Sequence, residues 1–442
     1  MSAPVEQLKA TLGLRSVVLF GLAYMAPMIV LGTFGVLAAD SNQTAPTAYL
    51  LALVAMLFTA ISYGRMARTF PVAGSAYSYA RRTIDSRVGF LVGWAILLDY
   101  FFLPMVIWLI GASYLNAQFT AIPPWLWILG FIVITTVINV LGLKLAANAN
   151  LILMAVQILV LALFVVLSLR GTGSAGVFSA RPFGHPGTTI TAVAAGAALA
   201  TYSFIGFDAI TTLTEETKDA RRTIPKAIVL VTVIGGALYV ITSYAAQLVA
   251  NTITVRNVDN EAFQIALRIG GNLFSAVFLA GLIVTQFASG IAAQASAARL
   301  LYAMGRDNVL PRKVFGYLHP RFSTPVVNIV AIGAVGLIGI SLSISTSTGF
   351  INFGAFTAFT FVNLAVLAHA IRRREVRTPK QWLINIAVPV FGAAIDVVLM
   401  TQLDVHALTI GPIWLGLGVI YLLVLTRGFS RPPPEVDFAA AE

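Results

Sequence analysis

The first long apolar stretch of the chain, residues 16–38, reads SVVLFGLAYMAPMIVLGTFGVLA and contains no charged side chain. About 20 apolar residues in an α-helix are enough to cross the hydrocarbon core of a bilayer. The stretch is too long for the apolar core of a cleaved signal peptide, and it lacks a convincing cleavage site. Pro27 stands at its centre, where proline removes a backbone hydrogen bond and clashes with the preceding turn. We therefore predict a membrane-spanning helix that is interrupted in its middle.

Eleven further long apolar runs follow along the chain. The composition agrees with this pattern, because 58% of the 442 residues are hydrophobic and only 10% are charged, whereas an ordinary soluble domain has about 25% charged residues. The period-two alternation of an outer-membrane barrel is absent. The sequence predicts an all-α integral membrane protein with twelve transmembrane helices, at residues 16–38, 45–66, 88–117, 123–143, 147–169, 188–213, 226–249, 272–301, 325–343, 351–371, 383–403 and 409–426.

The basic residues give the orientation of these spans. The chain has 28 Lys and Arg against 17 Asp and Glu. With the spans above, 24 of the basic residues lie on one side of the membrane, and only Arg170, Arg181, Arg256 and Arg268 lie on the other. Loops rich in Lys and Arg stay in the cytoplasm. We therefore predict a multi-pass protein of the inner (cytoplasmic) membrane with both termini in the cytoplasm. We expect the excess of positive charge to reflect this topology, and we expect no binding of nucleic acid.

Residues that carry enzyme chemistry are scarce. The chain has no cysteine, which excludes disulfides, thiolate metal sites and cysteine nucleophiles. Its four histidines show no HExxH or paired spacing, and no GxxxxGK[ST] motif occurs. The sequence therefore predicts no enzymatic activity, no metal site and no cofactor.

The sixth span is interrupted like the first. It contains Gly206 and Asp208 near its middle, in the run YSFIGFD at residues 202–208. Interrupted helices at matching positions of two halves indicate a transporter site at the bilayer midplane. The predicted substrate-binding residues in these two segments are Ala23, Tyr24, Met25, Ala26, Pro27, Met28, Tyr202, Ser203, Phe204, Ile205 and Gly206.

Three carboxylates lie within the predicted spans, and no Lys or Arg lies deep in any of them. Asp99, Asp208 and Asp396 each cost ~2.5–3.5 kcal/mol at the centre of a spanning helix, and such residues are functional candidates. A proton or a cationic substrate would be their partner. We predict Asp99 and the adjacent Tyr100 at the substrate site, Asp99 and Asp208 in proton coupling, and a structural role for Asp396.

Three motifs resemble those of the amino acid–polyamine–organocation superfamily over essentially the whole chain. They are FPVAGSAYSY at 70–79, SFIGFD at 203–208 with EE at 215–216 and RTIPK at 222–226, and RLLYAMGRD at 299–307 with LP at 310–311. Within that superfamily the chain is most similar to bacterial putrescine importers, through GLAYMAP at 21–27, LLDYFFLP at 97–104 and INFGA at 351–355.

The resemblance implies a five-plus-five inverted repeat with two extra C-terminal helices. One transporter domain, 1–426, would contain the first repeat (16–169), the second repeat (188–371) and the additional helices (383–426), followed by a short cytoplasmic tail, 427–442. Asp208 matches the acidic position of the family that is tied to gating or proton movement. Glu215, at the cytoplasmic end of span six, would pair with a nearby basic residue or gate the inner path.

Two positions depart from the pattern of relatives. Gly32 stands where putrescine importers have an aspartate, which keeps a neutral or basic amino acid or a monoamine open as the substrate. Gln157 stands where some proton-coupled relatives have a lysine. Ser289, together with carbonyls near Ala23, is a possible ion site for sodium, although protons are the favoured coupling ion.

Together these features predict a secondary transporter that imports a small amine or amino acid, with putrescine favoured and the lipid bilayer as its environment. The alternatives are a permease for neutral or basic amino acids and an amine/amino acid antiporter. A channel or a transporter-derived receptor is the alternative from another class, but the sequence has neither a filter-like repeat nor an additional soluble domain.

Overall fold

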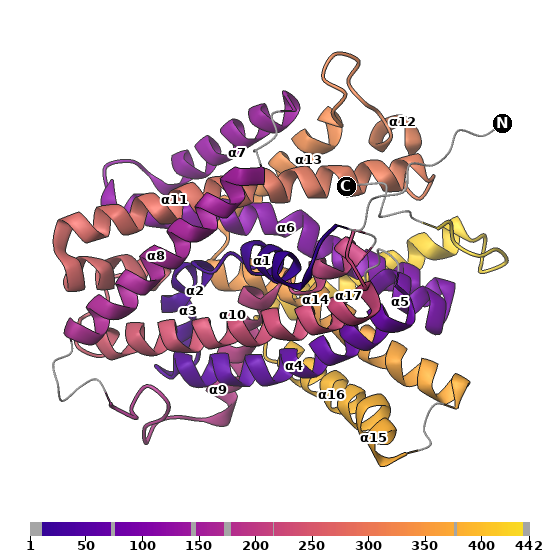
Figure 1. Ribbon diagram of the computed structural model, residues 1–442. Coiled ribbons are helices and arrows are strands. Elements are labelled where there is room, and N and C mark those ends of the chain that lie inside the picture. The colour runs from indigo at the N-terminus through magenta and orange to yellow at the C-terminus, as the bar shows by residue number, and fades with distance from the viewer. Residues whose placement is uncertain are drawn as a thin grey trace.

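The computed structural model describes residues 11–71, 76–142, 147–171, 178–214, 216–374 and 378–435, and within these ranges the chain is helical apart from turns and one isolated bridge between Leu12 and Thr217. Figure 1 shows the long helices running along a common dimension of the molecule. The helices are α1 (Leu14–Tyr24), α2 (Ile29–Gly32), α3 (Phe34–Asp40), α4 (Ala45–Thr69), α5 (Ala76–Thr83), α6 (Ser86–Gln118), α7 (Pro124–Val140), α8 (Ala147–Gly171), α9 (Ile190–Ala200), α10 (Ala220–Ala250), α11 (Glu261–Arg306), α12 (Arg312–Phe315), α13 (Val326–Gly336), α14 (Ile344–Arg373), α15 (Pro379–Trp382), α16 (Val388–Met400) and α17 (Val405–Leu425).

Short segments of tighter or wider helix connect or extend these elements. They are the 3₁₀-helices η1 (Thr201–Phe204), η2 (Asp208–Thr214), η3 (Val258–Asn260) and η4 (Leu337–Ser341), and the π-helical turn η5 (Leu383–Ala387). Ten segments of the described chain are long and apolar enough to cross a membrane, and two shorter apolar helices occupy Pro124–Val140 and Val326–Ser341. The prediction of an all-helical, multi-pass membrane protein is therefore confirmed.

The ends of several predicted spans differ from the structure; the span predicted at 351–371, for example, begins at Ile344 in α14. The predicted span 272–301 is part of α11, which continues from Glu261 across Gly271, where the backbone is non-helical with φ +62°. The predicted span 325–343 is α-helical only to Gly336 and then tightens into η4. The predicted span 383–403 begins earlier, at Pro379, and passes through η5. Hydropathy does not register these changes, because they alter backbone pitch and not side-chain polarity.

Helix α14 lies at the core, with 78% of its most apolar window buried. It packs against α4, α6, α16 and α17, while α4 packs along α10. In Figure 1 the short helices α1, α2 and α3 lie among α4, α6, α8 and α10, with α15 and α16 toward one edge. The interrupted first segment is therefore surrounded by longer helices that supply partners for its backbone.

Asp396 forms a buried polar cluster between α4, α14 and α16. Its carboxylate is fully buried and accepts hydrogen bonds from Thr59 Oγ1 at 2.9 Å and from Asn363 Nδ2 at 3.0 Å. Asn363 Nδ2 also lies 3.0 Å from Thr59 Oγ1. Hydrogen bonds between helices hold membrane bundles together because lipid offers no alternative partner. The contacts support the structural role that the sequence suggests for Asp396.

We expect Asp396→Leu to lower the stability of the folded protein by about 1–2 kcal/mol, because it leaves buried donors of Thr59 and Asn363 without their acceptor. Asp396→Asn keeps an acceptor and should cost less. The measurement is the thermal midpoint of unfolding in detergent, monitored by size-exclusion chromatography. Val397→Leu, on the exposed next position of α16, is the control, and equal midpoints for Asp396→Leu and this control would contradict the structural role.

Candidate functional site

The interruption predicted around Pro27 is present in the structure. Helix α1 ends at Tyr24 and α2 begins at Ile29. Ala26 between them has φ +46°, a conformation that L-residues adopt rarely. The freed Met28 N–H lies 3.4 Å from Oε1 of Gln157, a buried side chain of α8. The break is thus satisfied in part by a side chain 129 residues away, as buried backbone groups require in lipid.

The sixth predicted span breaks in the same way. Helix α9 ends at Ala200 and gives way to η1, and η2 begins only at Asp208. Gly206 between them has φ +114°, which a residue with a Cβ rarely adopts. A Cβ at Gly206 would also overlap the ring of Tyr24 from the first break. The two interrupted segments are therefore in direct contact, as the prediction of a shared site requires.

A tyrosine of α10 joins the two breaks. Tyr239 OH donates to the Ser203 carbonyl at 2.7 Å and lies 3.3 Å from the Met25 carbonyl. Tyr49 of α4 adds a contact of 3.0 Å between its hydroxyl and Ser203 Oγ, and its ring lies 5.6 Å from that of Tyr239. Of these two fully buried tyrosines, Tyr239 thus holds carbonyls that the interrupted helices expose, and Tyr49 holds the Ser203 hydroxyl.

Asp99 and Asp208 lie near each other in the fold. Asp99 of α6 interacts electrostatically with Asp208 and with Tyr202. Asp208 begins η2, where its carboxylate faces backbone N–H groups and accepts from Tyr63 OH at 3.4 Å. One carboxylate oxygen of Asp99 is buried without a hydrogen-bond partner among the described residues. Within the described chain neither carboxylate has a salt bridge to Lys or Arg, so the centre of the bundle carries uncompensated acceptors for a cation or a proton.

Other predicted residues lie elsewhere or have different neighbours. Phe204 is fully buried and packs edge-on against Tyr239. Tyr100 packs with Leu97 and Leu300 in a cluster between α6 and the end of α11. Ser289 is half-buried on α11, and the structure gives no hydrogen bond between described atoms of Ser289 and Ala23. Glu215 lies outside the described residues.

A small cavity adjoins the first break. Its volume is about 230 Å³, and it is lined by Ala26, Met28, Ile29, Gly32, Leu282, Thr285 and Gln286. The lining contains no charged residue, and a Cβ added at Gly32 would lie 3.3 Å from Cγ2 of Ile110. Across the described residues no group of three or more His, Asp or Glu side chains is arranged to hold a metal ion.

Sequence reasoning missed Tyr239, Tyr49 and Tyr63. Each is a single tyrosine in a long apolar helix, and a lone tyrosine in such a helix has many roles. Its hydroxyl normally finds a partner when buried, which is the only signal that the sequence offered. The partners are set by helix packing, so only the structure identifies them.

Comparison with known proteins places these features in context. A family model described as "Amino acid permease" matches residues 12–425. The low-affinity putrescine importer PlaP of Escherichia coli (strain K12) is 39% identical over 440 residues, covering 98% of this chain and 97% of the relative. The branched-chain amino acid permease BcaP of Bacillus subtilis (strain 168) is 25% identical over 450 residues, covering 96% and 95%. The methylthioribose transporter of the same organism is 24% identical over 422 residues, covering 91% and 89%.

Proposed function

The chain belongs to the amino acid permease family, and from this premise we propose that it imports a small organic amine or amino acid, with putrescine as the favoured substrate. The observation that carries the proposal is the pair of interrupted helices tied together by Tyr239, with the uncompensated carboxylates of Asp99 and Asp208 beside them. An anionic centre without a basic partner suits a cationic substrate. The 39% identity to a putrescine importer supports the same class of substrate.

We further propose the transmembrane arrangement implied by the family. Ten long apolar segments and two shorter ones are compatible with twelve spans. The breaks at residues 25–28 and 205–207 lie five spans apart, which supports an inverted repeat of 16–169 and 188–371 followed by two additional helices, 383–426. The excess of Lys and Arg on one side supports an inner-membrane location with cytoplasmic termini, the tail 427–442 included.

In this proposal the residues have separate roles. Segments 23–28 and 202–206 bind the substrate with their exposed carbonyls, and Asp99 attracts the ammonium group. Asp208, held by Tyr63 at 3.4 Å, carries the coupling proton, and Glu215 belongs to the inner gate. Sodium at Ala23 and Ser289 is the alternative coupling ion. The membrane potential favours entry of a cation by ~2.3 kcal/mol per charge per 100 mV, so a dication gains roughly twice that.

A permease for neutral or basic amino acids is the second candidate. The cavity at Gly32 has no charged lining that would hold a second ammonium group, and a branched-chain amino acid permease is among the relatives. An amine/amino acid antiporter uses the same site with exchange in place of proton coupling.

The test is uptake by purified protein in proteoliposomes. Labelled putrescine and a panel of amino acids are offered under an imposed pH gradient, an imposed sodium gradient and neither. A gradient of one pH unit supports roughly tenfold accumulation per coupled proton. Accumulation of amino acids but not of putrescine would overturn the amine as substrate. Dependence of uptake on the sodium gradient would overturn proton coupling. Conductance that does not saturate with substrate would indicate a channel.

We expect Asp99→Asn to raise the putrescine concentration for half-maximal uptake by roughly tenfold to a hundredfold, because a hydrogen bond to a charged group is worth about 1.5–3 kcal/mol. The measurement is initial uptake rate against putrescine concentration at constant pH. Asp396→Asn, which changes a buried carboxylate of another spanning helix away from the breaks, is the matched control. An unchanged half-saturating concentration in Asp99→Asn would remove Asp99 from the substrate site.

A further inference from the structure

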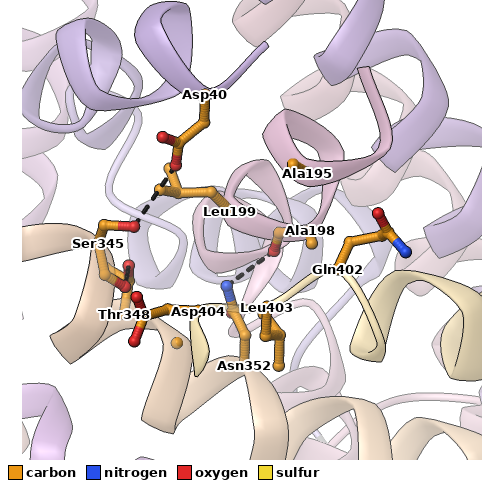
Figure 2. Close-up of a pocket in the computed structure, with 11 residues that line it drawn as sticks. Asp40, Ala195, Ala198, Leu199, Ser345, Thr348, Asn352, Gln402, Leu403 and Asp404 are labelled. Atoms are coloured by element: carbon orange, nitrogen blue, oxygen red, sulfur yellow. Dashed lines mark hydrogen bonds between the residues drawn. The ribbon is translucent and has the colours of Figure 1, made fainter. Parts of the chain in front are cut away.

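A second cavity lies at the opposite end of the molecule from the basic loops. It is a surface-open hollow of about 230 Å³ between the end of α3, α9, the beginning of α14 and the turn that joins α16 to α17. Figure 2 shows side chains from these four elements converging on it. The acids that line it are Asp40 and Asp404, and its lining contains no Lys or Arg.

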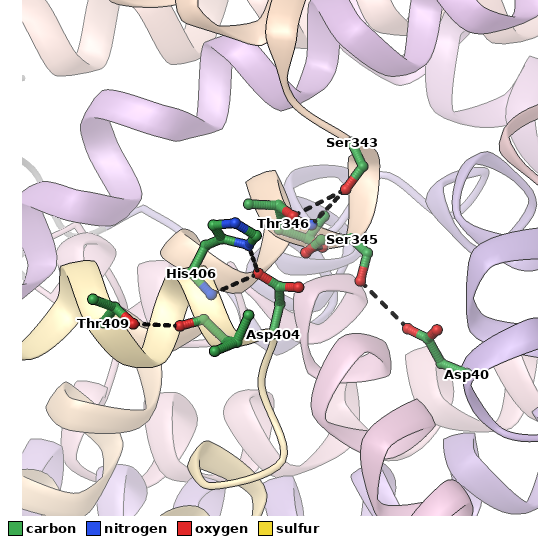
Figure 3. A network of polar contacts seen from close by, with 9 residues as sticks. Asp40, Ser343, Ser345, Thr346, Asp404, His406 and Thr409 are labelled. Atoms are coloured by element: carbon green, nitrogen blue, oxygen red, sulfur yellow. Dashed lines mark hydrogen bonds and ion pairs between the residues drawn. The ribbon is translucent and has the colours of Figure 1, made fainter.

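The polar atoms of this outer cavity are mostly acceptors. Asp40 Oδ2 accepts from Ser345 Oγ at 3.4 Å. Asp404 Oδ1 caps α17 by accepting from His406 N, and it contacts His406 Nδ1, both at 2.9 Å, as Figure 3 shows. These contacts involve one oxygen of each carboxylate, and the structure gives no bond from a described residue to the other. Burial raises the pKa of Asp40, the bond from Ser345 opposes this, and the charge of Asp404 raises it further.

Asn352 supplies an independent sign that the cavity accommodates a ligand. It is fully buried on α14 and lines the hollow. Its Nδ2 donates to the Ala198 carbonyl at 2.8 Å (Figure 2), while its Oδ1 has no hydrogen-bond partner among the described residues. A buried acceptor without a donor is unfavourable, because it has lost its hydrogen bonds to water and gained none in the protein. A donor brought by a ligand would satisfy it.

The lining suits an organic cation better than a bare metal ion. The side-chain acceptors come from three separate elements, namely α3, α14 and the turn between α16 and α17, around a hollow that is open to the surface, whereas a metal ion needs them converged within about 2.6 Å. Between the polar groups lie the apolar side chains Ala195, Leu199 and Leu403. Such a surface contacts methylene groups while carboxylates hold an ammonium group.

The position of the cavity connects it to the interrupted helices. Ala198, in its wall, precedes Ile205, where the second break begins, by seven residues on the segment formed by α9 and η1. Seven residues of helix span about 10 Å. The cavity is therefore about two helical turns from the second break.

We propose that the outer cavity bounded by Asp40, Asp404 and Asn352 is a second binding site, which takes an alkylammonium compound from the outside before it reaches the central breaks. This inference rests on the proposed function in one respect: the amine that binds in the outer cavity is the one that the protein then transports. The two carboxylates concentrate the cation at the entrance, and the amide oxygen of Asn352 accepts from its ammonium group. Opposite charges at an entrance raise the local concentration of a ligand and its rate of association.

The experiment combines uptake with direct binding of radiolabelled putrescine to the full chain in nanodiscs. In Asp40→Asn/Asp404→Asn, asparagine keeps the bond to Ser345 and the cap of α17 but removes both charges. We expect the half-saturating concentration for uptake to rise about threefold to tenfold with the maximal rate unchanged. Asp259→Asn, an acid of the same end of the molecule outside the cavity lining, should behave like the wild type.

Binding to Asp99→Asn/Asp208→Asn separates the outer site from the central one. We expect this variant to retain one putrescine site, which disappears when Asp40→Asn/Asp404→Asn is added. If Asp99→Asn/Asp208→Asn lost all putrescine binding, the outer site would be overturned. It would also be overturned if millimolar Ca²⁺ displaced the retained putrescine and methylammonium did not. Absence of transport by the wild type, with the outer binding intact, would instead contradict the proposed function and leave the outer site supported.

Discussion

Asp208→Asn is expected to abolish gradient-driven uptake, with a fall of at least about a hundredfold in initial rate, because positioned groups that transfer protons contribute on the order of 10²-fold or more. Asparagine preserves the size of the side chain and an acceptor for Tyr63 OH, which lies 3.4 Å from the carboxylate. It removes the negative charge of the carboxylate and with it the capacity to take up and release a proton. The measurement is uptake of labelled putrescine into proteoliposomes with an inward proton gradient.

Exchange of internal for external substrate provides the internal control for Asp208. Exchange requires substrate binding and alternation of the protein but no net movement of protons. We expect Asp208→Asn to retain exchange while it loses accumulation, and Asp396→Asn, at the structural cluster with Thr59 and Asn363, to retain both. Equal accumulation by Asp208→Asn and the wild type, at equal protein levels, would disprove the role of Asp208 in coupling.

Gly206→Ala is expected to reduce uptake by roughly tenfold or more. Gly206 has φ +114° between η1 and η2, and holding a residue with a Cβ in such a region costs about 1–3 kcal/mol. The added Cβ also overlaps the Tyr24 ring from the first break, so the two segments must separate. Both effects disturb the place where the interrupted helices meet. The measurement is the maximal rate of putrescine uptake, with the thermal midpoint recorded for the same preparation.

Gly130→Ala is the matched control for this substitution. Gly130 lies within α7, and a Cβ there meets no atom within 4 Å. Alanine is favoured over glycine in a helix interior by about 1 kcal/mol, so this variant should transport normally with equal or higher stability. If Gly206→Ala transported as well as Gly130→Ala, the contact between Gly206 and Tyr24 would have no part in function.

Much of the candidate site could be predicted because its cause is local. Proline at 27 cannot continue the backbone ladder of a helix, and Gly206 permits a conformation that other residues avoid. Both breaks occur where these residues predicted them. The roles of the predicted residues in binding and coupling stay predictions, which the experiments above address.

Partners across the bundle could not be predicted in the same way. Gln157 stood out in the sequence only because a lysine is found there in some relatives, yet in the structure it accepts from the Met28 amide. Tyr239 gave no signal beyond its hydroxyl, although it contacts carbonyls of both breaks. These contacts join residues 129, 36 and 214 positions apart, and hydropathy and local propensity carry no information at that range.

The sequence alone therefore determined the membrane class, most of the spans and the two interruptions, because apolar length, proline and glycine act through local physics. The orientation stays a prediction from the basic loops. The tertiary structure decided how the interruptions are satisfied and that Asp99 and Asp208 lie near one another. It also decided that Asp40, Asp404 and Asn352 surround one cavity. The physical reason is that a buried polar group must find a partner in three dimensions, and the packing of helices distant in the chain selects that partner.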